Sequence, residues 1–134
     1  MVLRAPRILR FVQANVETLP EDRCRAVVRI ELADSGLHSG SAEGGSAPVD
    51  GLRTVSRAAA EAVSEAFEPH GIRVRVRGVQ SVEAFGQTMV IASVAASFGG
   101  KTQTLLGICN DGQDGSRAAA LAVLSATNRF LGAP

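Results

Sequence analysis

Apolar and polar residues alternate along several stretches of the chain, and this spacing of two is typical of half-buried β-strands. The alternation is most regular over residues 23–32 and 72–77. Residues 88–98 are almost continuously apolar, which predicts a central strand covered on both faces. The six predicted strands span residues 7–17, 23–32, 37–42, 72–82, 88–98 and 102–109.

Apolar residues at spacings of three and four predict two helices, over residues 51–68 and 115–130. The first helix has a polar, solvent-facing side of arginine and glutamate, whereas the second has alanine and leucine on most sides. A helix that is apolar all round is expected to be buried. We therefore expect self-association, with Leu121 and Leu124 in a homodimer interface.

The two predicted helices also repeat each other in sequence. Residues 56–66 read SRAAAEAVSEA and residues 116–126 read SRAAALAVLSA, so eight of eleven positions are identical. Each copy follows three predicted strands, which indicates an internal repeat. We predict a single domain over residues 1–134, with pseudo-repeats at about 7–69 and 71–131. The expected fold is α+β, a mainly antiparallel six-stranded sheet with the two helices on one face.

The composition narrows the classes of partner. The 134-residue chain is 20% charged and has a formal net charge of +1. A net charge this small does not indicate binding to nucleic acid or to an anionic membrane. Trp and Tyr are absent, which argues against stacking on single-stranded nucleic acid. No apolar run approaches the roughly 18 residues of a membrane span. The basic first residues are followed by no apolar signal segment, so we expect a cytoplasmic protein without membrane or nucleic-acid partners.

No residue pattern predicts catalysis or a bound cofactor. His38 and His70 stand alone in predicted loops, without a nucleophile and an acid at informative spacing. Cys24 and Cys109 form no metal-binding pattern, and the chain has no glycine-rich phosphate loop. We therefore expect no enzyme activity, no metal and no cofactor.

The two strand-to-helix junctions are the candidate binding sites. Free backbone N–H groups at a helix start favour a carboxylate or phosphate. Asp50 in the first junction, and Asp111 and Asp114 in the second, could accept hydrogen bonds from a ligand ammonium group. Together the junctions could hold a zwitterion such as an amino acid. The alternative is that Asp50 and Asp114 only cap their helices.

Arginines alternate with apolar residues at the start of the fourth predicted strand. Arg73, Arg75 and Arg77 would form a basic stripe on a sheet, which Arg25 and Arg29 could extend. Such a stripe could bind an anionic partner. The alternative is a solvated face whose charge is balanced by acids on neighbouring strands.

Both junctions resemble segments of a known family. Residues 40–51 read GSAEGGSAPVDG, which resembles the GxGxGPVDA segment of the C-terminal regulatory domain of 2-isopropylmalate synthase and citramalate synthase. Residues 114–129 read DGSRAAALAVLSATNR, which resembles that domain's DIxxASxxAxxxALNR segment. The chain departs from the pattern at Ala47, Cys109 and Gly115, so the resemblance does not carry over leucine specificity.

The resemblance implies a doubled unit of three strands and a helix, a homodimer, and an effector pocket near both junctions. The catalytic barrel that precedes this domain in the synthases is not in the sequence, so it implies no condensing activity. The expected ligand-binding residues are Gly40, Gly44, Pro48, Val49, Asp50, Gly107, Cys109, Asp111 and Asp114.

These observations favour a free-standing, non-catalytic regulatory module that binds a small polar metabolite as a homodimer. The resemblance suggests a branched-chain amino acid as that metabolite. One alternative is a purely structural dimerisation module whose pocket has degenerated. The other is a binder of an anionic partner through the arginine stripe.

Overall fold

The computed structural model describes residues 9–33, 35–110 and 114–132, and it has the order strand-strand-strand-helix twice. The predicted α+β fold with repeated units is therefore confirmed. The first unit ends with a short 3-10 helix, η1 (Glu68–His70). The main elements are β1 (Leu9–Leu19), β2 (Arg23–Leu32), β3 (Gly36–Gly45), α1 (Pro48–Ala66), β4 (Arg73–Ala84), β5 (Gln87–Phe98), β6 (Lys101–Asn110) and α2 (Gly115–Gly132).

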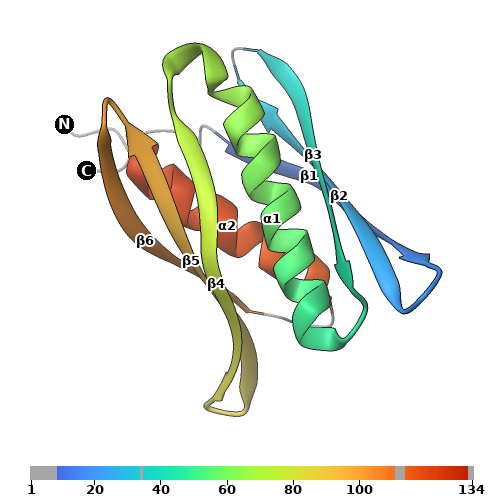
Figure 1. Ribbon diagram of the computed structural model, residues 1–134. Coiled ribbons are helices and arrows are strands. Elements are labelled where there is room, and N and C mark those ends of the chain that lie inside the picture. The colour runs from blue at the N-terminus through green and yellow to red at the C-terminus, as the bar shows by residue number, and fades with distance from the viewer. Residues whose placement is uncertain (1–8, 34, 111–113, 133–134) are drawn as a thin grey trace.

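The strands form two antiparallel sheets rather than one continuous sheet of six. β1–β2–β3 make the first sheet and β4–β5–β6 the second. Both helices lie between the sheets and touch each other, as Figure 1 shows. α1 contacts β2, β3 and β4, whereas α2 contacts β5, β6 and β1. The helices therefore separate the sheets, which prevents hydrogen bonding between their edges, and each sheet has one covered face as predicted.

The central strand of each sheet supplies one face of the core. In β2 every second residue from Cys24 to Leu32 is buried, which confirms the predicted half-buried strand. In β5 the inner residues Val90, Ala92 and Val94 are fully buried, while most outer residues are partly exposed. The expectation that β5 is covered on both faces is wrong for this chain alone, because α2, the helix that packs on β5, lies on its inner side.

The two sheets repeat each other down to an irregularity in their first strands. β1 has a register shift between Phe11 and Gln13, and β4 has one between Val76 and Gly78. Phe11 pairs with Ile30, and Val76 pairs with Val94. The strands β2 and β5 therefore correspond at an offset of 64 residues.

One glycine in each third strand lets a helix approach closely. Gly40 lies in β3 opposite Val28, and Gly107 lies at the equivalent place in β6. A Cβ atom on Gly40 would overlap the carbonyl oxygen of Ala58, and a Cβ atom on Gly107 would overlap that of Ala122. Ala58 and Ala122 are therefore equivalent, at an offset of 64 residues, whereas the sequence repeat has an offset of 60.

Side-chain hydrogen bonds give the same offset independently. The Ser64 hydroxyl accepts from the Val74 N–H at 2.9 Å and lies 3.1 Å from the Val74 carbonyl oxygen, to which it donates. The Asn128 amide accepts from the Leu9 N–H at 3.1 Å and donates to the Leu9 carbonyl at 3.2 Å. Ser64 and Asn128 are again 64 residues apart. Each helix thus holds a residue near the start of a strand from the other unit, which interlocks the two units.

Candidate functional site

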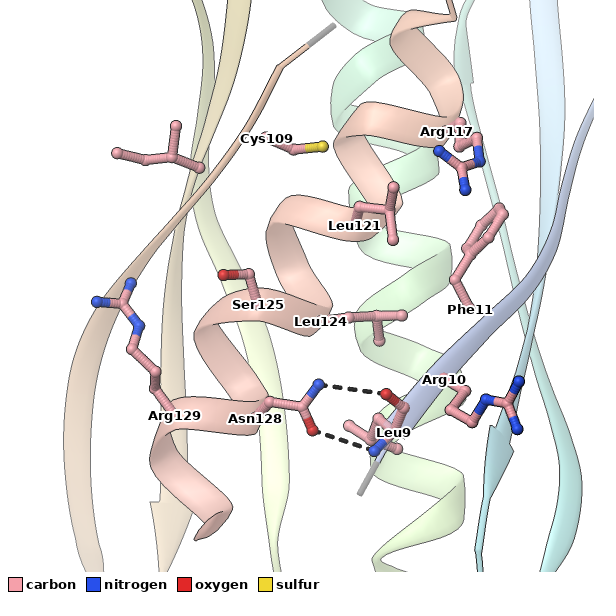
Figure 2. Close-up of a pocket in the computed structure, with 11 residues that line it drawn as sticks. Leu9, Arg10, Phe11, Cys109, Arg117, Leu121, Leu124, Ser125, Asn128 and Arg129 are labelled. Carbon is pink, nitrogen blue, oxygen red and sulfur yellow. Dashed lines mark hydrogen bonds between the residues drawn. The ribbon is translucent and has the colours of Figure 1, made fainter. Parts of the chain in front are cut away.

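A groove of about 690 Å³ runs along the exposed side of α2, between the start of β1 and the end of β6. We call it the α2 groove. β1 belongs to the first unit, whereas α2 and β6 belong to the second, so the groove lies on the seam between the units. Figure 2 shows the side chains that line it.

The floor of the α2 groove is apolar. Phe11 comes from β1, and Leu121 and Leu124 come from successive turns of α2. Leu124 is 3% exposed and packs within the chain, whereas Leu121 is only partly buried and faces the groove. Leu9 closes one end, held by Asn128. A ligand that enters the groove therefore meets aliphatic and aromatic carbon.

The rim of the α2 groove is basic. Arg10 lies 3.6 Å from the Glu31 carboxylate, and Arg129 donates to the Leu106 carbonyl. The Arg117 guanidinium lies 5.3 Å from the centre of the Phe11 ring, within range of a cation–π interaction. The described residues that line the groove include these three arginines but neither Asp nor Glu. This arrangement favours an anionic ligand group.

The residues predicted at the first junction serve packing and helix initiation. Gly44 lies in β3, where a Cβ atom would overlap the Thr54 hydroxyl oxygen, so β3 extends beyond its predicted end. Pro48 begins α1, which starts three residues earlier than predicted because proline suits the first helical position. Val49 is exposed on the first turn.

Asp50 does not cap α1, so that expectation is wrong. The N-cap residue is Ala47, which forms no side-chain cap hydrogen bond. Asp50 lies inside the first turn, 3.9 Å from Arg53, where a carboxylate is favoured by the helix dipole.

At the second junction Asp114 does act as a cap. Its carboxylate accepts from the Arg117 N–H at 3.0 Å, and its carbonyl accepts from the Ala118 N–H at 3.1 Å. Gly107 packs against α2, and Asp111 lies outside the described residues. Cys109 is the predicted ligand residue that lines the α2 groove; the others that the structure describes lie elsewhere.

The predicted arginine stripe is divided between two sheets. Arg25 and Arg29 lie on β2, whereas the remaining arginines lie on β4. The Arg25 guanidinium hydrogen-bonds the Glu43 carboxylate, which raises the pKa of Arg25 above its ordinary value. Arg73, Arg75 and Arg77 lie together on β4, but Arg25 and Arg29 do not extend their stripe because the helices separate the two sheets.

The sequence patterns do not single out Phe11, Arg117 or Ser125, which line the α2 groove. The signal that could have found Arg117 and Ser125 is the repeat itself, aligned at 64 rather than 60 residues. At that offset Arg117 corresponds to Arg53 and Ser125 to Glu61. The two helices then differ in charge on the side that faces away from the core.

Comparisons with known proteins assign the chain to no family. A scan against protein-family models and a search of curated proteins found no match to the chain. The resemblance to the synthase regulatory domain therefore stays a prediction. In the part of the chain that the structure describes, no helix is long and apolar enough to cross a membrane. The same residues contain no group of three His, Cys, Asp or Glu side chains placed to hold a metal ion.

Proposed function

We propose that this protein is a non-catalytic regulatory module that binds a small molecule in the α2 groove and acts as a homodimer. The observation that carries the proposal is the groove itself, with a volume of about 690 Å³, an apolar floor and a polar rim. Ligand pockets usually have this composition and a volume of roughly 300–1,000 Å³.

The position of the α2 groove supports a regulatory role. Its walls come from both units, and the start of β1 is held to α2 by the two hydrogen bonds between Asn128 and Leu9. A ligand that touches β1 and α2 together stabilises the docked arrangement of the two units. Binding would then increase the population of the docked state relative to any state in which β1 is released from α2.

The ligand-binding part of the proposal is tested by thermal unfolding against a panel of amino acids and 2-oxo acids. A ligand at one hundred times its Kd adds about 2.7 kcal/mol of apparent stability. The branched-chain amino acids are the first compounds to test, because the family resemblance suggests them.

A pair of matched variants assigns the binding to the α2 groove. Ser125→Trp places an indole in the groove from an exposed position, and Glu61→Trp makes the same change at the equivalent exposed position of α1. We expect Ser125→Trp to lose the ligand-induced rise in Tm and Glu61→Trp to keep it. A flat panel, or equal behaviour of the two variants, contradicts the proposal.

The homodimer part is supported by a contrast between the outer faces of the two sheets. In the second sheet this face carries Met89 and Ile91 on β5, and Leu106 and Ile108 on β6. Leu106 and Ile108 are each 53% exposed. Large apolar side chains and few charges are typical of the core of a protein interface.

The equivalent positions of the first sheet are more polar. Arg25 and Val27 stand where the second sheet has Met89 and Ile91, and two serines replace Leu106 and Ile108. The two sheets have the same strand order and pairing, so folding alone does not require this difference in polarity. The apolar outer face of the second sheet is therefore the better candidate for a dimer interface. The same observation favours the second candidate function, a structural dimerisation module, which predicts a dimer whose Tm no panel compound raises.

A further inference from the structure

The two helices present equivalent stripes of residues on their outer sides, but the stripes differ in charge. In α1 the stripe contains two arginines and two glutamates, whereas the stripe of α2 contains two arginines and no acid. The stripes consist of Arg53, Arg57, Glu61 and Glu65 in α1, and Arg117, Leu121, Ser125 and Arg129 in α2.

Charged side chains of the α1 stripe form contacts with other residues of the same chain. The Glu65 carboxylate accepts from the Ser39 N–H at 3.2 Å and lies 3.4 Å from the His38 ring nitrogen. The Arg57 guanidinium donates to the Glu43 carbonyl at 2.6 Å. These contacts tie α1 to the edge strand β3, and the stripe as a whole is electrically balanced.

The α2 stripe leaves a positive excess beside an apolar floor. Arg129 is bonded to the Leu106 carbonyl, and Arg10 on the groove rim has Glu31 as its partner. Arg117 forms no ion pair with any residue in 9–33, 35–110 or 114–132. Its guanidinium lies over the Phe11 ring, which keeps it at the groove. A planar guanidinium is matched by a carboxylate, which accepts two parallel hydrogen bonds.

The floor of the α2 groove selects the rest of the ligand. Leu121 lies one helical turn from Arg117, and Phe11 lies under the guanidinium. An acid bound at Arg117 therefore extends its chain across aliphatic and aromatic carbon. Burial of an aliphatic chain against such a floor is favourable, whereas a polar chain would lose hydration without replacement hydrogen bonds.

The same groove disfavours an ammonium group. None of the described lining residues is a carboxylate that could accept from it, and the guanidinium groups of Arg117 and Arg129 would repel it. Asp114, the described aspartate at the start of α2, already caps the helix. An amino acid would therefore bind more weakly than the 2-oxo acid with the same carbon skeleton.

We infer that the α2 groove binds an amphiphilic carboxylate, an aliphatic acid that lacks an ammonium group, with its head group on Arg117 and its chain along Phe11 and Leu121. This inference rests on the proposed ligand-binding function of the groove and assigns its chemical class.

Four compounds that share the same branched isobutyl group test the assignment by calorimetric titration. They are 4-methyl-2-oxopentanoate, leucine, 3-methylbutan-1-amine and 3-methylbutyl phosphate. We expect the oxo acid to bind at least about tenfold more tightly than leucine, because the ammonium of leucine has no acceptor in the groove. The amine should not bind, and the phosphate should bind more weakly than the oxo acid.

A matched pair of arginine variants locates the head group. Arg117→Gln should weaken binding of the oxo acid by about tenfold or more, the loss expected for a hydrogen bond to a charged group. Arg53→Gln, at the equivalent position of α1, should leave the affinity unchanged. Equal losses in the two variants would overturn the assignment of Arg117.

The remaining outcomes separate this inference from the proposed function. Binding of leucine or the amine that is as tight as that of the oxo acid, and is abolished by Ser125→Trp, overturns the carboxylate inference and leaves the ligand-binding function standing. Tightest binding of the phosphate has the same consequence. If none of the four compounds binds, the inference is wrong; a response of the wider panel at the groove would still support the proposed function.

Discussion

At the scale of single residues, three glycines have a packing role that the sequence pattern does not indicate. Gly40, Gly44 and Gly107 are predicted to line an effector pocket, and each lies where a side chain would meet a helix. Their strands need backbone that approaches an alanine-rich helix closely. The sequence alone could not separate a packing role from a binding role for these glycines.

The packing role of Gly107 is tested by replacing it with alanine. A Cβ atom there would overlap the Ala122 carbonyl, so β6 and α2 must move apart. We expect Gly107→Ala to destabilise the protein by about 1–3 kcal/mol, the usual cost of overpacking, in urea unfolding.

Gly51→Ala provides the control for this experiment. Gly51 lies in α1, and a Cβ atom there would meet no atom within 4 Å. This substitution should leave stability unchanged or raise it by up to about 1 kcal/mol, because alanine favours a helix more than glycine does. A Gly107→Ala protein as stable as the wild type would show that the strand can move away freely, which contradicts the packing account.

At the scale of elements, the hydrophobic pattern predicts the strands and helices well. The predicted strand over residues 23–32 coincides with β2, because its alternation is regular and one face is buried. The ends are less predictable where tertiary contacts decide them. β3 continues to Gly45 beside α1, and α1 begins at Pro48 rather than after Asp50.

The sequence predicted the wrong alignment offset for the two helices of the internal repeat. Eight identities align the helices at an offset of 60, yet the glycine contacts and the Ser64 and Asn128 hydrogen bonds align them at 64. Four residues are close to one helical turn, so a shift of four presents the same face to the core. Alanines repeated along both helices give identities one turn out of register, which is why sequence identity favoured the wrong offset.

The interlocking of the units predicts similar losses from two distant substitutions. Asn128→Ala removes both hydrogen bonds to Leu9, and Ser64→Ala removes both to Val74. We expect each to cost about 1–3 kcal/mol, because polar backbone groups in partly buried places lose their partners. Urea unfolding measures the loss, and hydrogen exchange should accelerate at Leu9 in the first variant and at Val74 in the second.

Ser125→Ala is the control for these two variants. Ser125 is an exposed residue of α2 one turn from Leu121, and its replacement should change stability by less than about 0.5 kcal/mol. If Asn128→Ala is equally neutral, α2 does not hold β1 through these bonds.

At the scale of the whole molecule, two sheets with the same topology enclose two helices. The outer faces of the sheets differ in the polarity of their exposed side chains. Sequence identity between the helices and the order of the elements predicted the repeated units, but not that the helices lie between separate sheets. That arrangement depends on which strand edges remain unpaired, and hydrophobic spacing does not report it. The α2 groove could not be foreseen for the same reason, since β1 and α2 are far apart in the chain.

The dimer is a property of the whole molecule, and the internal repeat supplies its control. Ile91→Lys places a charge on the outer face of the second sheet, and Val27→Lys places one at the equivalent position of the first. We expect light scattering to show a dimer for wild type and for Val27→Lys, and a monomer for Ile91→Lys, because an unpaired charge is costly to bury. A monomeric wild type, or a dimer in all three proteins, contradicts the assigned face.

The most direct test of ligand binding in the α2 groove is an NMR titration of the ¹⁵N-labelled protein with 4-methyl-2-oxopentanoate and, separately, with leucine. We expect saturable shift changes that concentrate at the start of β1, at Ile108 and Cys109, and along α2 from Leu121 to Asn128. The equivalent outer side of α1 should remain unchanged. Shift changes centred on Gly44 to Asp50, or no saturable change with either compound, would contradict binding in the groove.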